Sequence, residues 1–261
     1  RQLGSLCPGH PESHLTTGVE TTTGPLGQGL ATSVGMAIAS QWLGARYNRP
    51  GYTLFDFRAW TICGDGCLME GISGEAASLA GHLGLANLCW IYDNNHITIE
   101  GSTDLAYSDD VAARFAGYGW NVLRVGDAND LKQLARAYET AKRATDRPTM
   151  IIVDSHIGYG SPKKQDTASA HGEALGEEEI KATKRGYGWP EDAKFLIPDG
   201  VRERFAGSKQ LVLARRELRV AERQIARGVR HALLQRPVES SELVEHGIQP
   251  LGDRAELVTT P

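Results

Sequence analysis

The sequence has little that would place it in a membrane, outside the cell or on a polyanion. No run of eighteen apolar residues occurs among its 261 residues, so no transmembrane helix is expected. Its opening residues lack both the pattern of a signal peptide and a starting methionine. Lysine and arginine number 28 against 32 aspartates and glutamates, and the net charge of −4 predicts neither a nucleic-acid partner nor a membrane partner.

Cysteine is also scarce. Cys7, Cys63, Cys67 and Cys89 include no Cys-x-x-Cys pair, which excludes the disulfide framework of a small secreted protein. Cys63 and Cys89 lie in or beside apolar segments, where buried free thiols are expected. A reducing, cytoplasmic location is therefore the prediction.

Glycine and short apolar segments are plentiful. The 30 glycines cluster at turns, and 41% of the residues are hydrophobic, as in ordinary globular proteins. Apolar runs of strand length alternate with segments of helical periodicity, which predicts an α/β fold with a parallel β-sheet and helices on both faces. Ligands of such sheets bind at the edge formed by the carboxyl ends of the strands. Helices are expected at 28–47, 71–86, 108–119 (with Ser108 as the cap) and 127–145, and strands at 59–63, 87–95, 121–125 and 148–155.

The pattern changes near residue 206, which is taken as a domain boundary. Residues 1–206 carry the alternating pattern, after a polar loop over residues 1–27. Residues 211–235 have the periodicity of a basic amphipathic helix, and the rest of the chain is acidic and weakly patterned. Residues 207–261 are therefore expected to be a helix and a poorly ordered tail of unknown role.

Two polar motifs flank one predicted strand–helix–strand unit. Gly64-Asp65-Gly66 follows the first strand, and Asn94-Asn95 ends the second. Adjacent parallel strands bring both motifs to the same edge of the sheet. There the Asp65 carboxylate, the Asn95 amide and the backbone carbonyl of Ile97 could share one Mg²⁺ ion. The alternative is a pair of ordinary turns, since these residue types are common in turns.

The sequence around these motifs resembles transketolase. The Gly-Asp-Gly and Asn-Asn motifs, about thirty residues apart, are similar to the binding motif for thiamine diphosphate. The resemblance covers residues 1–206 and implies the thiamine diphosphate-binding (PP-type) fold. It is carried by PGHPE at 8–12, GVETTTGPLGQGLATSVGMAIA at 18–39, GDGCLMEGISGEAASLAGHLGLANL at 64–88, DNNHITIEG at 93–101 and IGYGSPKKQDTASAHG at 157–172.

The resemblance implies a site for thiamine diphosphate and Mg²⁺, for which Ca²⁺ or Mn²⁺ could substitute. Asp65 and Asn95 would bind the metal through their side chains, and Ile97 through its carbonyl. The aminopyrimidine ring would lie against the loop at 24–26, and the diphosphate would approach the backbone at residue 66. The residues that would bind the cofactor are Gly24, Leu26, Asp65, Gly66, Asn95, Ile99 and His171.

The resemblance also implies four catalytic residues. His10 would reach the hydroxyls of the substrate, and His171 would reach the substrate at the reacting centre. Glu70 and Glu75 match buried acids that lie near a subunit interface and link the two cofactors of a homodimer. Taken alone, loop histidines and helix glutamates are more often solvent-facing residues. The other histidines are interpreted as structural or surface residues: His14, His82, His96, His156, His231 and His246.

The implied activity is transfer of a two-carbon ketol unit from a ketose phosphate to an aldose phosphate, as in the pentose phosphate pathway or the Calvin cycle. This chain would supply the half of the site that holds the diphosphate and the metal, and would be inactive alone. The family's first segment would precede Arg1, and its pyrimidine-binding and C-terminal domains would follow residue 206. An edge of the sheet would then be exposed.

Three alternatives stay open. The chain could be a subunit that completes its site with a separate pyrimidine-domain chain. It could be a non-catalytic module that binds thiamine diphosphate. It could also come from a dihydroxyacetone synthase-like enzyme, because the motifs do not separate that relative from transketolase.

Overall fold

The computed structural model describes residues 10, 12–16, 18–19 and 21–207. The chain divides into two compact units, Arg1–Glu191 and Asp192–Pro261. Within the second unit, residues 201–207 are helical. The helix predicted at 211–235 and the tail beyond it lie outside the described residues.

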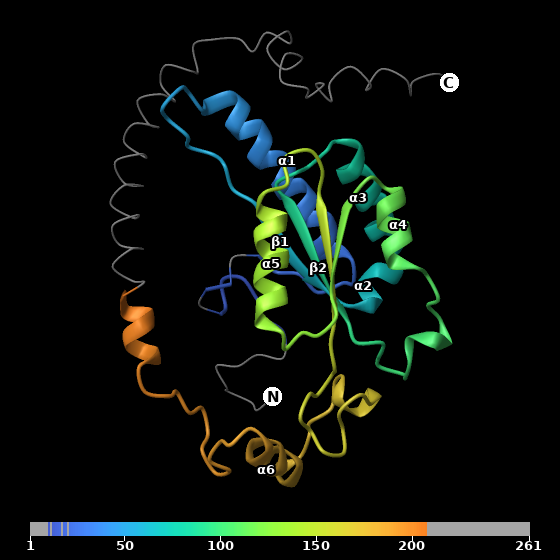
Figure 1. The fold of residues 1–261 in the computed structure, drawn as a ribbon, viewed down its shortest axis with the longest axis vertical. Helices are drawn as coiled ribbons and strands as arrows, with labels where there is room; N and C mark the ends of the chain where they lie inside the picture. Colours follow the sequence, from blue (N-terminus) through green and yellow to red (C-terminus); the bar gives the residue numbers. More distant parts are fainter. Residues whose placement is uncertain (1–9, 11, 17, 20, 208–261) are drawn as a thin grey trace. The chain divides into compact units, whose positions relative to one another are not determined.

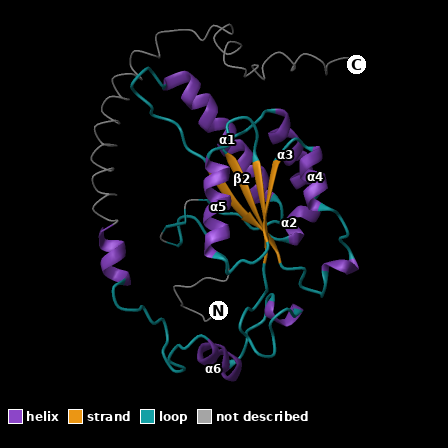
Figure 2. Cartoon of the chain, in the orientation of Figure 1, coloured by secondary structure: helices purple, strands orange, loops and turns teal. Residues whose placement is uncertain are grey.

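The first unit contains a four-stranded parallel β-sheet (Figure 2). Its strands are β1 (Ala59–Cys63), β2 (Leu88–Asn94), β3 (Asn121–Val125) and β4 (Thr149–Asp154). They lie in the order β1-β2-β4-β3, and every neighbouring pair is parallel. The four predicted strands and their parallel arrangement are confirmed.

Helices cover both faces of this sheet (Figure 1). The principal helices are α1 (Gln28–Tyr47), α2 (Asp65–Met69), α3 (Gly71–His82), α4 (Val111–Gly117), α5 (Leu131–Lys142) and α6 (Glu177–Gly186), with short 3-10 turns η1 (Thr103–Leu105) and η2 (Ala168–Ala170). Buried side chains of α1, α3 and α4 pack in one hydrophobic cluster, and those of α5 pack in a second. The chain moves from β1 to β2 and on to β3 over the first face, then returns from β3 to β4 through α5 on the other. Right-handed crossovers require this change of face when the direction reverses.

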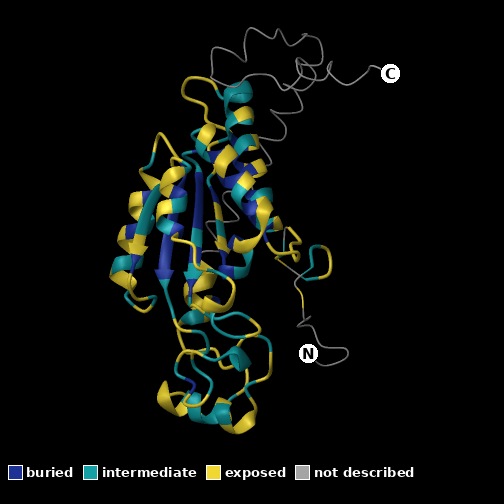
Figure 3. Cartoon of the chain, turned by 90° about the vertical axis from the view of Figure 1, so that its right-hand side faces the viewer, coloured by how far each residue is buried: buried dark blue, intermediate teal, exposed yellow. Residues whose placement is uncertain are grey.

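Aromatic rings fill the larger cluster. The Trp90 ring centroid lies 4.7 Å from that of Trp120 and 5.8 Å from that of Phe115. The two indole nitrogens are satisfied, because Trp90 donates to Ser33 Oγ at 2.8 Å and Trp120 donates to the Ala77 carbonyl at 2.8 Å. Such packing fixes the helices on this face against the central strands, whose buried residues are dark blue in Figure 3.

Three local expectations are corrected by the structure. The helix predicted to reach residue 86 ends at His82, because Gly84 has a left-handed φ of +59°. The cap of α4 is Asp110 rather than Ser108: its side chain accepts from the Ala113 N–H at 3.0 Å. The alternative interpretation of Gly64-Asp65-Gly66 as an ordinary turn is also wrong, because Asp65 is the first residue of the short helix α2.

Strand β1 forms one edge of the sheet, as expected from the resemblance. Its Ile62 side chain is 75% exposed, whereas the ends of the strand, Ala59 and Cys63, are buried.

Cys63 and Cys89 are both buried free thiols, as predicted, and burial raises the pKa of the Cys89 thiol to about 12. Within the described part of the chain, no helix combines the length and apolar character needed to cross a bilayer.

Candidate functional site

The carboxyl ends of β1, β2 and β4 carry the polar residues of the candidate site. The sheet register pairs Cys63 with Tyr92 and Asn94 with Asp154. Asp65 follows β1 by two residues, and Asn95 follows β2 directly. Both motifs of the predicted strand–helix–strand unit therefore lie at one edge of the sheet.

Asp65 is a buried carboxylate at the start of α2. It is only 4% exposed, and the Tyr92 hydroxyl donates a hydrogen bond to its Oδ1. Burial raises the pKa of the Asp65 carboxyl, while the hydrogen bond from Tyr92 and the nearby His96 oppose that rise. The charged form is costly in such a place unless a cation lies beside it.

Asn95 is held at both ends of its amide. Its Oδ1 accepts from the backbone N–H of Ile97 at 2.9 Å, and its Nδ2 donates to Asp93 Oδ2 at 3.2 Å. A carbonyl oxygen has two lone pairs, so Asn95 Oδ1 keeps one of them for a second partner. The same amide that orders the turn at residues 95–97 can thus also bind a cation.

The loop beyond Asn95 is tightly hydrogen-bonded. The N–H of Thr98 donates to the Gly101 carbonyl at 2.6 Å, and the N–H of Thr103 donates to the His96 carbonyl at 3.0 Å. His96 takes a left-handed φ of 61° to make this turn, and Ile97 bridges to Ser102. The backbone around the Ile97 carbonyl is therefore well defined.

The oxygen donors at this edge are of the kind that a hard cation accepts. The described residues contain no metal-binding group of three or more histidine, cysteine, aspartate or glutamate side chains. One carboxylate, one amide oxygen and one backbone carbonyl are instead available. Mg²⁺ is commonly held by one or two carboxylates together with ligand phosphates and water, so these residues fit such an ion.

The loop before α1 supplies a second part of the site. A Cβ atom placed on Gly24 would lie 2.8 Å from His10 Nε2, and one placed on Gly66 would lie 3.1 Å from Leu26 Cδ1. The structure thus brings His10 against Gly24 and Leu26 against Gly66. His10 Nδ1 lies 2.7 Å from Glu12 Oε1. Because a carboxylate only accepts, the proton of a neutral His10 is on Nδ1.

Apolar side chains stand exposed beside these polar groups. Leu26 is 54% exposed and Ile99 is 67% exposed, although both belong to ordered loops. A cavity of about 430 Å³ runs along β1 and is lined by residues that include Gly24, Pro25 and Cys67. These surfaces are suited to cover an aromatic ring.

Of the two predicted acids, Glu75 lies on α3 and Glu70 is the residue directly before it. Glu70 is the N-cap of this helix, and its side chain is exposed. A Cβ atom placed on Gly27 would lie 3.1 Å from the Cβ of Glu70. Glu75 is exposed in a hollow of about 810 Å³ whose lining includes Leu79 and Arg114. Neither acid is buried within this chain, so the burial implied by the resemblance would require a partner.

His171 is an exposed residue at the end of η2. Its backbone N–H donates to the Ala168 carbonyl at 2.9 Å. Within the described residues, no hydrogen bond or ion pair joins its side chain to Asp65 or Asn95.

Three residues that contact the site were missed from the sequence: Tyr92, Asp93 and Ser155. Tyr92 contacts Asp65, Asp93 contacts Asn95, and the Ser155 hydroxyl donates to Asp93 Oδ1. A polar residue at the end of an otherwise apolar strand, as Asp93 is, was the available signal.

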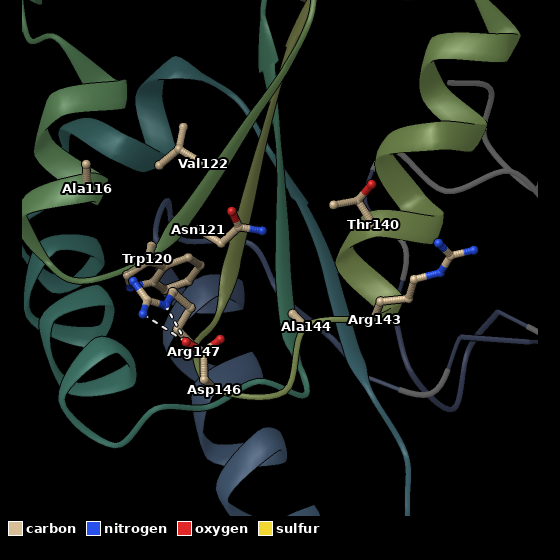
Figure 4. Close-up of a pocket in the computed structure, with 9 residues that line it drawn as sticks. All are labelled: Ala116, Trp120, Asn121, Val122, Thr140, Arg143, Ala144, Asp146 and Arg147. Carbon is tan, nitrogen blue, oxygen red and sulfur yellow. Dashed lines mark hydrogen bonds and ion pairs between the residues drawn. The ribbon is translucent and has the colours of Figure 1, made fainter.

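Another hollow, of about 610 Å³, lies at the opposite end of the strands (Figure 4). Its lining includes Trp120 and Asn121 at the start of β3 and Arg147 just before β4. The Arg147 guanidinium pairs with its neighbour Asp146 at 2.8 Å. None of the predicted site residues lines this hollow, so it is separate from the candidate site.

Comparisons with known proteins find similar sequences and structures. The family model described as transketolase, thiamine diphosphate binding domain, matches residues 1–240. A transketolase from Nostoc sp. is 54% identical over 202 residues, which are 77% of this chain and 30% of that protein.

Solved structures give the same result. Transketolase from Leishmania mexicana has a TM-score of 0.82 and 40% identity, and the match covers 100% of this chain and 38% of that one. Transketolase from Pichia stipitis in complex with sedoheptulose 7-phosphate has a TM-score of 0.80 and 41% identity, over 88% of this chain and 34% of that one. The chain thus spans between 30% and 38% of the length of these relatives.

Proposed function

Because this chain belongs to the transketolase family, we propose that its sheet edge binds thiamine diphosphate through a divalent cation, and that the protein transfers two-carbon ketol units between sugar phosphates. The family and its α/β fold are those predicted from the sequence motifs. The observation that carries the proposal is the buried Asp65 carboxylate, which lies at the same edge as an oriented Asn95 amide.

The proposed metal ligands are Asp65, Asn95 and the carbonyl of Ile97. Asp65 supplies the negative charge, and the cation in turn offsets the cost of burying that carboxylate. Mg²⁺ is the proposed ion, with Ca²⁺ or Mn²⁺ as substitutes, since all three accept oxygen ligands. Bound thiamine diphosphate would be anchored through this ion by its phosphates.

The remaining residues position the cofactor and the substrate. Bound thiamine diphosphate supplies an electron sink for cleavage of a carbon–carbon bond next to a carbonyl. Leu26 and Ile99 would exclude water from the cofactor's rings. Gly66 has no side chain, so the backbone at this position could approach the diphosphate. His10, held by Glu12 with its proton on Nδ1, presents Nε2 as an acceptor for a substrate hydroxyl. His171 is proposed to reach the diphosphate and the reacting centre.

Sugar phosphates are the proposed substrates. Solved relatives from Pichia stipitis are complexes with xylulose 5-phosphate and with sedoheptulose 7-phosphate. Those molecules are ligands of those proteins, and their shared chemistry supports a ketose phosphate as donor and an aldose phosphate as acceptor here.

Calorimetric titration of the chain with thiamine diphosphate tests this proposal. We expect binding heat in excess Mg²⁺ and none after addition of a chelator, because the diphosphate is held chiefly through the metal. Circular dichroism checks that the chain stays folded under both conditions. Absence of heat from a folded chain in Mg²⁺ would contradict the proposal that this half of the site binds the cofactor.

A homodimer is the proposed assembly, with α3 at its interface. Ile72, Glu75 and Leu79 recur on one exposed face of this helix, and Leu79 is 46% exposed. The exposed apolar side chains of Ile72 and Leu79 on this face favour contact with a second protein surface. Such a contact would also bury Glu70 and Glu75, as the resemblance implies.

Leu79→Glu is expected to weaken the dimer at least about tenfold, since a charge would be buried in an apolar contact. Leu131→Glu is the matched control: Leu131 is an exposed leucine of α5, on the other face of the sheet. Sedimentation velocity over a range of concentrations measures both variants. A wild-type chain that stays monomeric throughout, or a Leu131→Glu variant that dissociates equally, would argue against α3 as the interface.

A further inference from the structure

We propose that Asp93 is a positioning residue that sets which end of the Asn95 amide faces the cation, and that Ser155 holds Asp93 in this role. The inference rests on the proposed function of the site, because the cation is part of that proposal. It concerns residues that do not themselves bind the cofactor.

The contacts form a short chain across two strands. Asn95 Nδ2 donates to Asp93 Oδ2 at 3.2 Å, and the Ser155 hydroxyl donates to Asp93 Oδ1. Both oxygens of the Asp93 carboxylate are thus engaged. Asp93 lies near the end of β2, and Ser155 directly follows β4, which pairs with β2 in parallel. The orientation of the amide is therefore tied to the sheet itself.

The chemistry of the two groups makes this contact directional. An amide has a donating NH₂ end and an accepting oxygen end, and the two are nearly equal in size. A carboxylate only accepts, so Asp93 can bind the NH₂ end of Asn95 but not the oxygen end. The oxygen must then lie on the other side, where Ile97 donates to it. A flipped amide would turn its NH₂ protons toward a cation, which they would repel.

Ser155 completes the arrangement. Without its hydroxyl, the Asp93 carboxylate would be free to rotate about its last torsion and to lose the Asn95 contact. The structure thus assigns to Ser155 the same function that residues beyond the ligand shell have in other metal sites: they orient the groups that bind the metal. Loss of such a partner typically costs roughly 10- to 100-fold in metal affinity.

Asp93→Asn and Ser155→Ala test the proposal. An asparagine at 93 offers both an acceptor and a donor, so residue 93 no longer selects the NH₂ end of the Asn95 amide, and only the Ile97 N–H still favours the observed orientation. Ser155→Ala keeps the Asp93 charge but releases the carboxylate. For both variants we expect the Mg²⁺ concentration that half-saturates thiamine diphosphate binding to rise roughly 10- to 100-fold. Titration calorimetry measures it.

Asp154→Asn is the matched control. It removes the same charge from the same edge, but Asp154 accepts from Asn94 Nδ2 at 2.7 Å and from the Arg124 guanidinium at 3.0 Å, with no described contact to Asn95. In Asp154→Asn, the Mg²⁺ concentration that half-saturates thiamine diphosphate binding should rise less than in Asp93→Asn. Equal changes in the two would show that charge alone matters and would overturn the positioning role.

Nuclear magnetic resonance of the side-chain amide of Asn95 gives a readout that needs no cofactor. In the wild-type chain its NH₂ protons should exchange slowly with water because one of them is bound to Asp93. In both variants exchange should quicken, while thermal unfolding shows that the fold persists. Unchanged exchange in both folded variants would overturn the inference.

The outcomes separate this inference from the proposed function. If the wild-type chain binds thiamine diphosphate, Asp65→Asn does not, and Asp93→Asn and Ser155→Ala bind with the wild-type Mg²⁺ dependence, then the positioning role is wrong and the proposed function stands. If the folded wild-type chain does not bind at all, the proposed function fails, and this inference fails with it.

Discussion

Replacing Asp65 by asparagine is expected to weaken Mg²⁺-dependent binding of thiamine diphosphate by about 100-fold or more, which corresponds to a loss of roughly 2.7 kcal/mol. Asp65 is the one carboxylate among the proposed ligands, and the amide keeps its shape but removes its charge. Calorimetric titration at a fixed, high Mg²⁺ concentration measures the change.

The same variant should not be less stable than the wild-type chain. Burial raises the pKa of the Asp65 carboxyl, so the folded state disfavours its charged form, and at neutral pH the ionised group reduces the stability of the metal-free fold. Asparagine carries no charge, and its oxygen can still accept the hydrogen bond from Tyr92. The expected result is lost binding with an equal or higher melting temperature in the absence of metal. Wild-type affinity in Asp65→Asn would show that this carboxylate is not a ligand.

The fold could be predicted well because each of its elements has a local cause in the sequence. The four strands are short apolar runs, and β4 is buried over its first five residues. The start of α1 at Gln28 follows from the glycine-rich loop before it. The start of α4 was predicted two residues too early, because Ser108 and Asp110 are both good N-cap residues. Burial of Val111 and Phe115 selects the later start, at Asp110.

The candidate site was predictable only in part. Spacing and parallel topology bring Asp65 and Asn95 to one edge, since that depends on strand order alone. The contacts of Tyr92, Asp93 and Ser155 depend on register between strands and on rotamers. A single sequence does not reveal those features. The roles of His10 and His171 came from the resemblance, because a loop histidine has no periodicity that indicates a function.

Gly27→Ala is expected to destabilise the chain by roughly 2–5 kcal/mol. Gly27 has a φ of +79°, a left-handed conformation that costs other residues about 1–2 kcal/mol. An added Cβ would also lie 2.7 Å from Ile72 Cγ2 and 2.8 Å from Ser73 Oγ, and overpacking of this kind costs about 1–3 kcal/mol. Ser73 cannot easily move away, because it is fully buried and its hydroxyl donates to the Cys67 carbonyl. Urea denaturation followed by circular dichroism gives the free energy of unfolding.

The effect of Gly27→Ala should reach the site because Gly27 lies between two of its parts. It follows Leu26, the side chain that contacts Gly66, and it packs against the first turn of α3 beside Glu70. Gly35→Ala is the control: Gly35 lies in α1, and a Cβ there would meet no atom within 4 Å, so alanine should be neutral or stabilise the helix by up to about 1 kcal/mol. These two alanine substitutions, eight positions apart, should therefore affect the free energy of unfolding differently: one lowers it, and the other leaves it unchanged or raises it. If both variants kept the wild-type stability, the close packing between the loop before α1 and the start of α3 would be wrong, and with it the placement of Leu26 against Gly66.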